Sequence, residues 1–164
     1  MVNPNVSANG HSLLSHFRHG RDDAISFETP AAIFKDEMVP VTECRFCRDN
    51  ELLDDAPIAE TKHLFVLASR DPKLTEAVMI IPKQHFEDPF EMGADEWADM
   101  PLALDQAKSH LARFAPDGYS LGWNVGTTAG QTVDHVHLHV IARHKGDAAS
   151  GHGLRGFLKD ALGR

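Results

Sequence analysis

The most regular pattern of polar and apolar residues lies between positions 134 and 141. Polar and apolar side chains alternate there with a period of two. Successive side chains of a β-strand point to opposite faces of the sheet, so this pattern predicts a strand. His135, His137 and His139 would line one face, and the aliphatic residues between and after them would enter a core. The sequence therefore predicts a row of three imidazoles with a fixed spacing, backed by apolar packing.

Strand-like patterns also occur earlier in the chain. Residues 61–68 and 77–81 are two β-rich apolar runs separated by a turn that contains proline. Strand, turn and strand at this spacing predict an antiparallel hairpin, and the second run is apolar enough to be buried on both faces. Residues 119–125 alternate as another strand, and a glycine-containing loop over 126–132 leads into the histidine strand.

Residues 95–114 show a helical period instead. Asp95 suits the N-cap of this helix, and Pro101 inside it predicts a kink or a new start because proline lacks a backbone donor. Two strands, a helix and two further strands predict an α+β fold with an antiparallel sheet, not a doubly wound one. The apolar face of the helix is expected to comprise Trp97, Met100, Leu104, Ala107, Leu111 and Phe114.

Composition and charge narrow the functional classes. The 164 residues suffice for one domain, and 42% hydrophobic with 24% charged residues is ordinary for a soluble globular protein. The net charge of −8 argues against a general nucleic-acid binder, although local donors could still bind a small anion. No apolar run approaches the ~18 residues of a membrane span, and residues 1–20 lack the apolar centre of a signal peptide. We therefore expect a cytoplasmic protein with no nucleic-acid or membrane partner.

The two cysteines, Cys44 and Cys47, form a Cys-x-x-Cys pair. In a reducing compartment such a pair indicates metal binding or redox chemistry more than a structural disulfide.

The three histidines cannot all bind the same metal ion. The outer two Cα atoms would lie ~13 Å apart on a strand, whereas Zn–N bonds are only ~2.0–2.1 Å long. One metal could take an adjacent pair such as His135 and His137, which leaves at least one imidazole for other chemistry. A neutral imidazole is a competent nucleophile and a proton carrier near pH 7.

The loop before the histidines favours an anionic substrate. Its glycines would let backbone amides approach a phosphate, and Gln131 and Thr132 add side-chain donors. Asn124, at the end of the preceding strand, could add another. Such a loop alone is usually a plain turn, but its direct connection to the histidine row favours phosphate binding.

Three segments together resemble the histidine triad (HIT) superfamily. Asn124 to Ile141 is similar to its signature, in which three histidines alternate with apolar residues. The segment from Ile80 to His85 and the Cys-Arg-Phe-Cys knuckle match bacterial and Hint-like members in order and spacing. The tail from Arg143 to Asp147 resembles members that hydrolyse dinucleoside polyphosphates.

The resemblance covers roughly residues 44–147. It implies an N-terminal arm over 1–40, a HIT domain over 41–148 and a C-terminal tail over 149–164. The HIT-like fold would be a five-stranded antiparallel sheet with one long helix and short helices, usually paired as a homodimer.

The family resemblance also implies a reaction. A purine nucleotide or nucleotide conjugate, a phosphoramidate or a dinucleoside polyphosphate, would be attacked at its α-phosphorus and release a nucleoside monophosphate. His137 would form a covalent nucleotidyl adduct, His139 would contact the phosphate and help the leaving group, and His135 would complete the triad. The nucleotide would be held by Asn124, Gly130, Gln131, Thr132 and His139.

In cysteine-bearing relatives, the residues that match Cys44, Cys47, His85 and His135 bind zinc. Two thiolates and two imidazoles suit a closed tetrahedral site, so the resemblance implies a structural zinc ion here.

One position departs from the family pattern. Relatives usually carry an acid for the ribose hydroxyls where this chain has Ser69, so either Asp71 takes that role or the ribose is held differently. Two other functions stay open: a non-catalytic nucleotide sensor, and a zinc-dependent hydrolase that uses His-x-His.

Overall fold

The structure is a computed structural model that describes residues 43–53, 55–148 and 150–163. The N-terminal arm expected over residues 1–40 lies outside the described residues. Within the described part, no helix is both long enough and apolar enough to cross a membrane.

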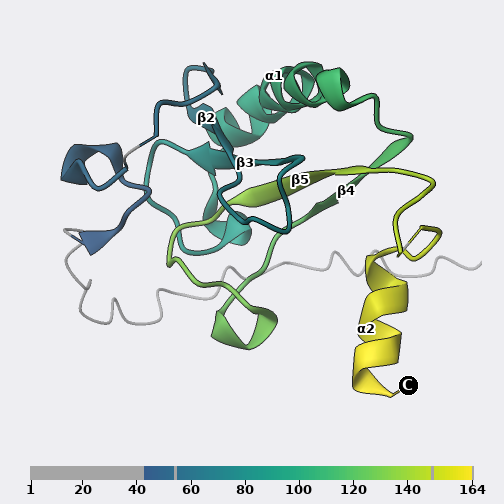
Figure 1. The fold of residues 1–164 in the computed structure, drawn as a ribbon. Helices are drawn as coiled ribbons and strands as arrows, with labels where there is room; N and C mark the ends of the chain where they lie inside the picture. Colours follow the sequence, from purple (N-terminus) through teal and green to yellow (C-terminus); the bar gives the residue numbers. More distant parts are fainter. Residues whose placement is uncertain (1–42, 54, 149, 164) are drawn as a thin grey trace, which may run out of the picture. The chain divides into compact units, whose positions relative to one another are not determined.

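A five-stranded antiparallel sheet forms the centre of the fold, in the order β1-β2-β3-β5-β4 (Figure 1). The predicted hairpin is confirmed, because β2 and β3 pair from Leu64 opposite Pro82 to Ala68 opposite Val78. The predicted antiparallel α+β architecture is confirmed with it. The strands are β1 (Ala59–Glu60), β2 (Leu64–Ala68), β3 (Ala77–Pro82), β4 (Gly118–Gly122) and β5 (Leu138–Arg143).

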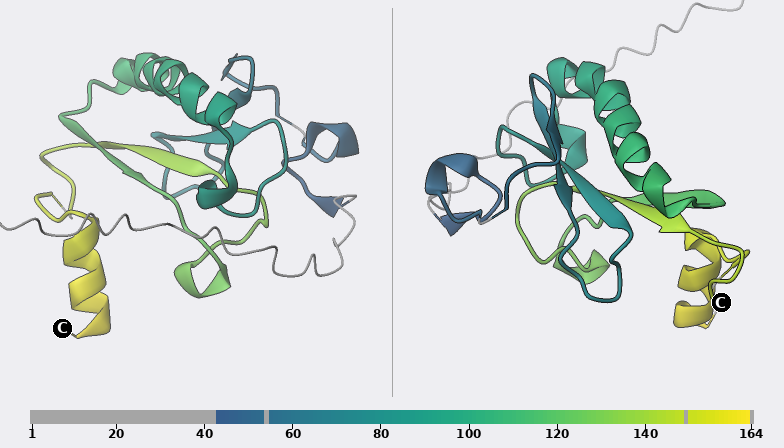
Figure 2. Two further views of the ribbon diagram at one scale, coloured as in Figure 1. Left: turned by 180° about the vertical axis from the view of Figure 1, so that it is seen from behind. Right: turned by 45° about the horizontal axis from the view of Figure 1, so that its top comes forward.

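The two α-helices lie on opposite sides of this sheet (Figures 1 and 2). Helix α1 (Ala94–Leu111) packs against β2 and β3, and α2 (Leu154–Leu162) lies beside the ends of β4 and β5. The connections contain short 3₁₀-helices at Arg48–Asn50, Pro89–Glu91, Ala112–Phe114 and Thr127–Ala129.

The main core lies between α1 and the sheet. Ala103, Ala107 and Leu111 of the helix are fully buried there against side chains such as Val66 and Leu138. A second cluster on the other face contains Phe46, Phe65, Leu67 and Ile81. Strands β2 and β3 are therefore buried on both faces, as the continuous apolar pattern predicted for the second of them.

Helix α1 differs from its prediction in three ways. It runs through Pro101 as a single helix, so of the two expected outcomes the new start does not occur, and the kink stays a prediction. Gly93, not Asp95, is the N-cap, and Asp95 lies in the first turn, where a negative charge favours the positive end of the helix dipole. Trp97 is 44% exposed, whereas Glu96 is buried.

The histidine strand is shorter at its start than predicted. Strand β5 begins at Leu138, and His135 lies in a bend before it. The amide of Val136 donates to the carbonyl of Phe86 at 2.7 Å instead of joining the ladder with β3. Pro82 ends β3, and proline has no N–H with which to continue the pairing. The three histidines therefore do not share one regular strand face.

Candidate active site and metal centre

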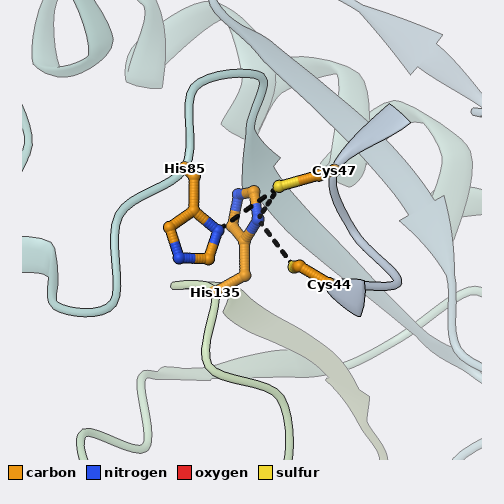
Figure 3. A group of neighbouring side chains, drawn as sticks. All are labelled: Cys44, Cys47, His85 and His135. Atoms are coloured by element: carbon orange, nitrogen blue, oxygen red, sulfur yellow. Dashed lines mark hydrogen bonds between the residues drawn. The ribbon is translucent and has the colours of Figure 1, made fainter. Parts of the chain in front are cut away.

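The first part of the site is a cluster of two cysteines and two histidines. Figure 3 shows them pointing toward one another from the knuckle, the turn after β3 and the segment before β5. Their ligand atoms all lie within 4.8 Å of one another. The Sγ atoms of Cys44 and Cys47 lie 3.5 and 3.6 Å from Nδ1 of His135, and Sγ of Cys47 lies 3.3 Å from Nδ1 of His85.

The backbone orients the His135 ring toward the thiols. Its Nε2 lies 2.9 Å from the carbonyl oxygen of Pro82, and a carbonyl only accepts hydrogen bonds. Nε2 therefore carries the proton, and Nδ1 presents its lone pair to Cys44 and Cys47. A histidine that donates one ring N–H to a backbone carbonyl and offers the other nitrogen is the arrangement found around bound metals.

Burial favours the neutral forms of Cys47 and His135 in the absence of a cation. It raises the pKa of Cys47 to about 12, with contributions from the side chain of Cys44 and the charges of Cys44 and Asp49. It also lowers the pKa of His135 to about 4, assisted by the charges of His85 and His137. A divalent cation would stabilise the thiolates and bind the neutral imidazoles directly. The four predicted ligands are thus brought together, and the donor set fits a metal ion.

The second part of the site is a cavity of about 300 Å³ on the sheet face opposite α1. His137 and His139 line it with their ring centroids 4.9 Å apart, and the knuckle residue Phe46 packs edge-on 5.3 Å from the ring of His137. His135 is not among the lining residues, because its ring turns into the metal cluster. The prediction of a central imidazole with a histidine on each side is therefore wrong: His137 has His139 on one side and Phe46 on the other.

The local backbone selects one tautomer of His137. Its Nδ1 lies 2.8 Å from the carbonyl oxygen of His135, two residues earlier. This carbonyl can only accept, so in the neutral ring Nδ1 carries the proton and Nε2 has the lone pair. Burial and the neighbouring charge of His137 lower the pKa of His139, which keeps that ring neutral near pH 7. The pair can therefore supply a nucleophilic nitrogen.

The loop before the histidines is held by Gln131. Its side chain is buried, its Oε1 accepts from the amide of Gly126 at 2.6 Å, and its Nε2 donates to the carbonyls of Glu87 and Val133. Gly126 and Gly130 have φ angles of 75° and 90°, which a residue with a Cβ rarely adopts. Gln131 thus makes its hydrogen bonds to the backbone and holds the shape of the loop.

The other predicted nucleotide-binding residues lie at different distances from the cavity. Thr132 lines it. Asn124 lies beside Gly130, with its amide nitrogen 3.8 Å from the point where a Cβ of Gly130 would stand, but it is not among the lining residues.

Both candidates for the ribose position line the cavity. The amide of Asp71 donates to Oγ of Ser69 at 3.2 Å, and Oδ1 of Asp71 accepts from the amide of Lys73 at 2.8 Å. The departure at Ser69 therefore leaves a hydroxyl and a carboxylate side by side at the end of β2.

Sequence reasoning missed the knuckle side of the cavity. Phe46 could have been found, since a residue between two metal ligands is fixed close to the site. Asp55 and Arg70 form an ion pair on the same wall, and the guanidinium lowers the pKa of Asp55. No signal in the sequence identified this pair. The additional lining residues are Arg45, Phe46, Leu53, Asp55, Leu67, Ala68, Arg70, Leu74, Met79 and Val133.

Comparison with known proteins agrees with this geometry. Residues 51–146 match the HIT domain family, more than half of the chain. The chain belongs to the HIT domain family. The resemblance and the fold that it implied are thereby confirmed.

This HIT-domain chain is similar to several proteins in sequence. It is 31% identical over 105 residues to an uncharacterised HIT-like protein of Methanocaldococcus jannaschii, covering 63% of this chain and 81% of that one. It is 33% identical to a bis(5'-adenosyl)-triphosphatase of Dictyostelium discoideum, covering 53% and 59% of the two chains. It is 31% identical to an adenosine 5'-monophosphoramidase of Schizosaccharomyces pombe, covering 61% and 74%.

Among solved structures, the HIT domain is similar to a zinc-bound histidine triad family protein from Mycobacterium smegmatis. The two are 30% identical with a TM-score of 0.53, and the match covers 68% of this chain and 82% of the other.

Proposed function

We propose that this HIT-domain protein is a nucleotidyl hydrolase or transferase that cleaves at the α-phosphorus of a purine nucleotide conjugate. The observation that carries this proposal is the hydrogen bond from Nδ1 of His137 to the carbonyl of His135. In the neutral ring it places the lone pair on Nε2, and His137 lines a cavity large enough for a nucleotide. Relatives that are named as a dinucleoside triphosphatase and as a phosphoramidase support this class of reaction.

In the proposed reaction, Nε2 of His137 attacks the α-phosphorus and displaces the leaving group. A P–N bond forms as the bond from phosphorus to the leaving group breaks. His139 hydrogen-bonds to the phosphate and assists departure of the leaving group, and His135 orients His137 through its carbonyl. Water or another phosphate then attacks the adduct, releases the nucleotide and restores the neutral imidazole.

The rest of the cavity would hold the substrate. Thr132 and the amides of the loop around Gly130 would bind phosphate oxygens, and Gln131 would keep that loop in shape, with Asn124 supporting it. Ser69 and Asp71 would bind the ribose hydroxyls. Phe46 and its apolar neighbours on the knuckle side would contact the purine.

We also propose that the four-residue cluster binds a structural zinc ion through Cys44, Cys47, His85 and His135. Such an ion would tie the knuckle to the segment that carries His137 and would supply no step of the reaction. The zinc-bound relative from Mycobacterium smegmatis supports the choice of metal.

A homodimer would follow the family pattern, and β4 offers a surface for it. This strand is at the edge of the sheet, and Leu121 on it is 42% exposed. The rings of Trp97 and Trp123 lie nearby in edge-to-face contact, 6.1 Å apart. A monomeric mass in light scattering at micromolar concentration would contradict the dimer.

The test is incubation with an adenosine phosphoramidate and with a dinucleoside polyphosphate, followed by chromatography for AMP. Mass spectrometry of acid-labile adducts after brief exposure should find the nucleotidyl group on His137, and His137→Asn should give neither adduct nor product. His110→Asn, on α1 at the other face of the sheet, is the matched control. An adduct on another residue would refute the mechanism, and nucleotide binding without AMP release from either substrate would favour a sensor.

A further inference from the structure

A second cavity of about 520 Å³ continues from the first along the same face of the sheet. In β5, the side chains of His139, Ile141 and Arg143 alternate with buried residues of the α1 core and therefore face away from α1. His139 lines the first cavity, and Ile141 and Arg143 line the second. Leu74 lines both, so the two cavities adjoin.

Helix α2 contributes Leu154 and Phe157 to the lining of this second cavity. The Cδ1 atom of Leu154 lies only 3.2 Å from the point where a Cβ of Gly122 would stand, and Gly122 pairs with His139 in the sheet. The absence of a side chain at Gly122 thus lets α2 approach β4 at the residue opposite His139. The family match ends at residue 146, so α2 lies outside the residues that match the HIT domain.

The second cavity combines an apolar wall with cationic groups. Leu74, Ile141 and Leu154 are apolar, and the ring of Phe157 is 43% exposed, which leaves aromatic surface open. A partly exposed aromatic ring beside a cavity is suited to stacking on a flat heterocycle.

The cationic groups are held in fixed positions. Arg143 bonds to Asp147 at 3.0 Å and to Oγ of Ser120 at 3.0 Å. His144 lies 2.6 Å from Glu76, whose side chain raises the pKa of this histidine.

These pairs largely balance their own charges, and Lys73 adds a further positive charge. It lines the second cavity, and no carboxylate among the described residues forms an ion pair with it. Lys73 also follows the turn of Ser69 and Asp71, both of which line the first cavity. It therefore stands where a phosphate chain would pass from one cavity to the other.

We infer that the second cavity binds the leaving half of a dinucleoside polyphosphate, with the departing base against Phe157 and its phosphates near Lys73. The inference rests on the proposed function, because it assumes attack by His137 in the first cavity. From His139 to Arg143 the strand rises about 13 Å, a distance that a leaving nucleoside polyphosphate can span. The chain would then favour dinucleoside polyphosphates over phosphoramidates, whose leaving group is too small to reach α2.

The experiment compares the affinities of AMP and of a methylene-bridged dinucleoside tetraphosphate by calorimetry. The wild-type protein should bind the tetraphosphate analogue more tightly than AMP. In Phe157→Ala the ratio of the two affinities should fall about tenfold, the loss expected for one base stack. The matched control is Leu158→Ala, since Leu158 is 61% exposed on the same helix but does not line the cavity.

A second variant tests the phosphate contact independently of the helix. Lys73→Gln should lower the same ratio and weaken its dependence on salt, while Lys159→Gln on the exposed side of α2 should change neither. An analogue that binds no more tightly than AMP, or a ratio unchanged in both Phe157→Ala and Lys73→Gln, would overturn the second half-site and leave the proposed function intact. Failure to bind either ligand would overturn both.

Discussion

The two ends of the histidine motif contain the same residue type in opposite surroundings. His135 has no exposed surface, bonds to a carbonyl through Nε2 and presents Nδ1 to two thiols. His137, two residues later, bonds to a carbonyl through Nδ1 and presents Nε2 to a cavity. In each ring, the nitrogen that hydrogen-bonds to a carbonyl is a donor, so the other nitrogen is the one that can bind a metal or act as a nucleophile. Under the proposed function, one short motif therefore binds a metal through His135 and a phosphate through His137.

The largest expected effect is the loss of turnover without the nucleophile His137, which separates catalysis from metal binding. His137→Ala should lower kcat at least about 10⁴-fold, because removal of a covalent nucleophile abolishes the main route of the reaction. Its zinc content, measured by atomic absorption, should stay at one ion per chain because His137 is outside the cluster. Loss of zinc together with activity would mean that His137 is itself a metal ligand and would favour a zinc hydrolase that uses His-x-His.

A smaller effect on catalysis is expected for His139, which lines the same cavity as His137. His139→Ala should slow turnover about 10²- to 10³-fold, the contribution usual for a group that assists proton transfer or phosphate binding. The melting temperature should change little, because this ring borders a cavity and is only partly buried. Steady-state kinetics and a thermal melt check the two statements, and unfolding of the variant would contradict the assigned role.

Removing the metal tests whether the cluster that contains His135 stabilises the fold. Dialysis against a chelator should destabilise the fold by about 3–4 kcal/mol, the linkage expected for a ligand present at several hundred times its Kd. For a chain of this size, the melting temperature should fall by roughly 10 °C. Cys47→Ser should show the same low melting temperature with or without chelator. An unchanged melt of the wild-type protein would mean that the cluster holds no stabilising ion.

The metal-free protein should also become less stable on acidification. Burial lowers the pKa of His135 to about 4 from 6.5, so below pH 6.5 the unfolded chain binds a proton that the folded chain does not. Stability should therefore fall between pH 6.5 and about pH 4, by up to about 3 kcal/mol from this residue. Urea midpoints at several pH values measure it. In His135→Phe this part of the pH dependence should disappear, and its persistence would assign the effect to other groups.

Much of the fold could be predicted because local patterns and tertiary structure agree there. The apolar runs of β2 and β3 are buried on both faces, and the period of α1 matches its buried side at Met100, Ala107 and Leu111. Trp97 fits the same period but is 44% exposed. Periodicity identifies a helix face but cannot say how far the sheet beneath extends, so residues at the margin of that face were assigned wrongly.

Of the candidate site, the sequence by itself determined the residues: the knuckle, His85 and the alternating histidines, whose types and spacing follow directly from the chain. The tertiary structure decided how they are divided. The pairing of β3 with β5 ends at Ile80 opposite Leu138, so the segment before β5 leaves the ladder. His135 then turns toward the cysteines, while His137 and His139 face the cavity. The contacts responsible join residues up to 91 positions apart, and a period measured along one segment contains no information about such partners.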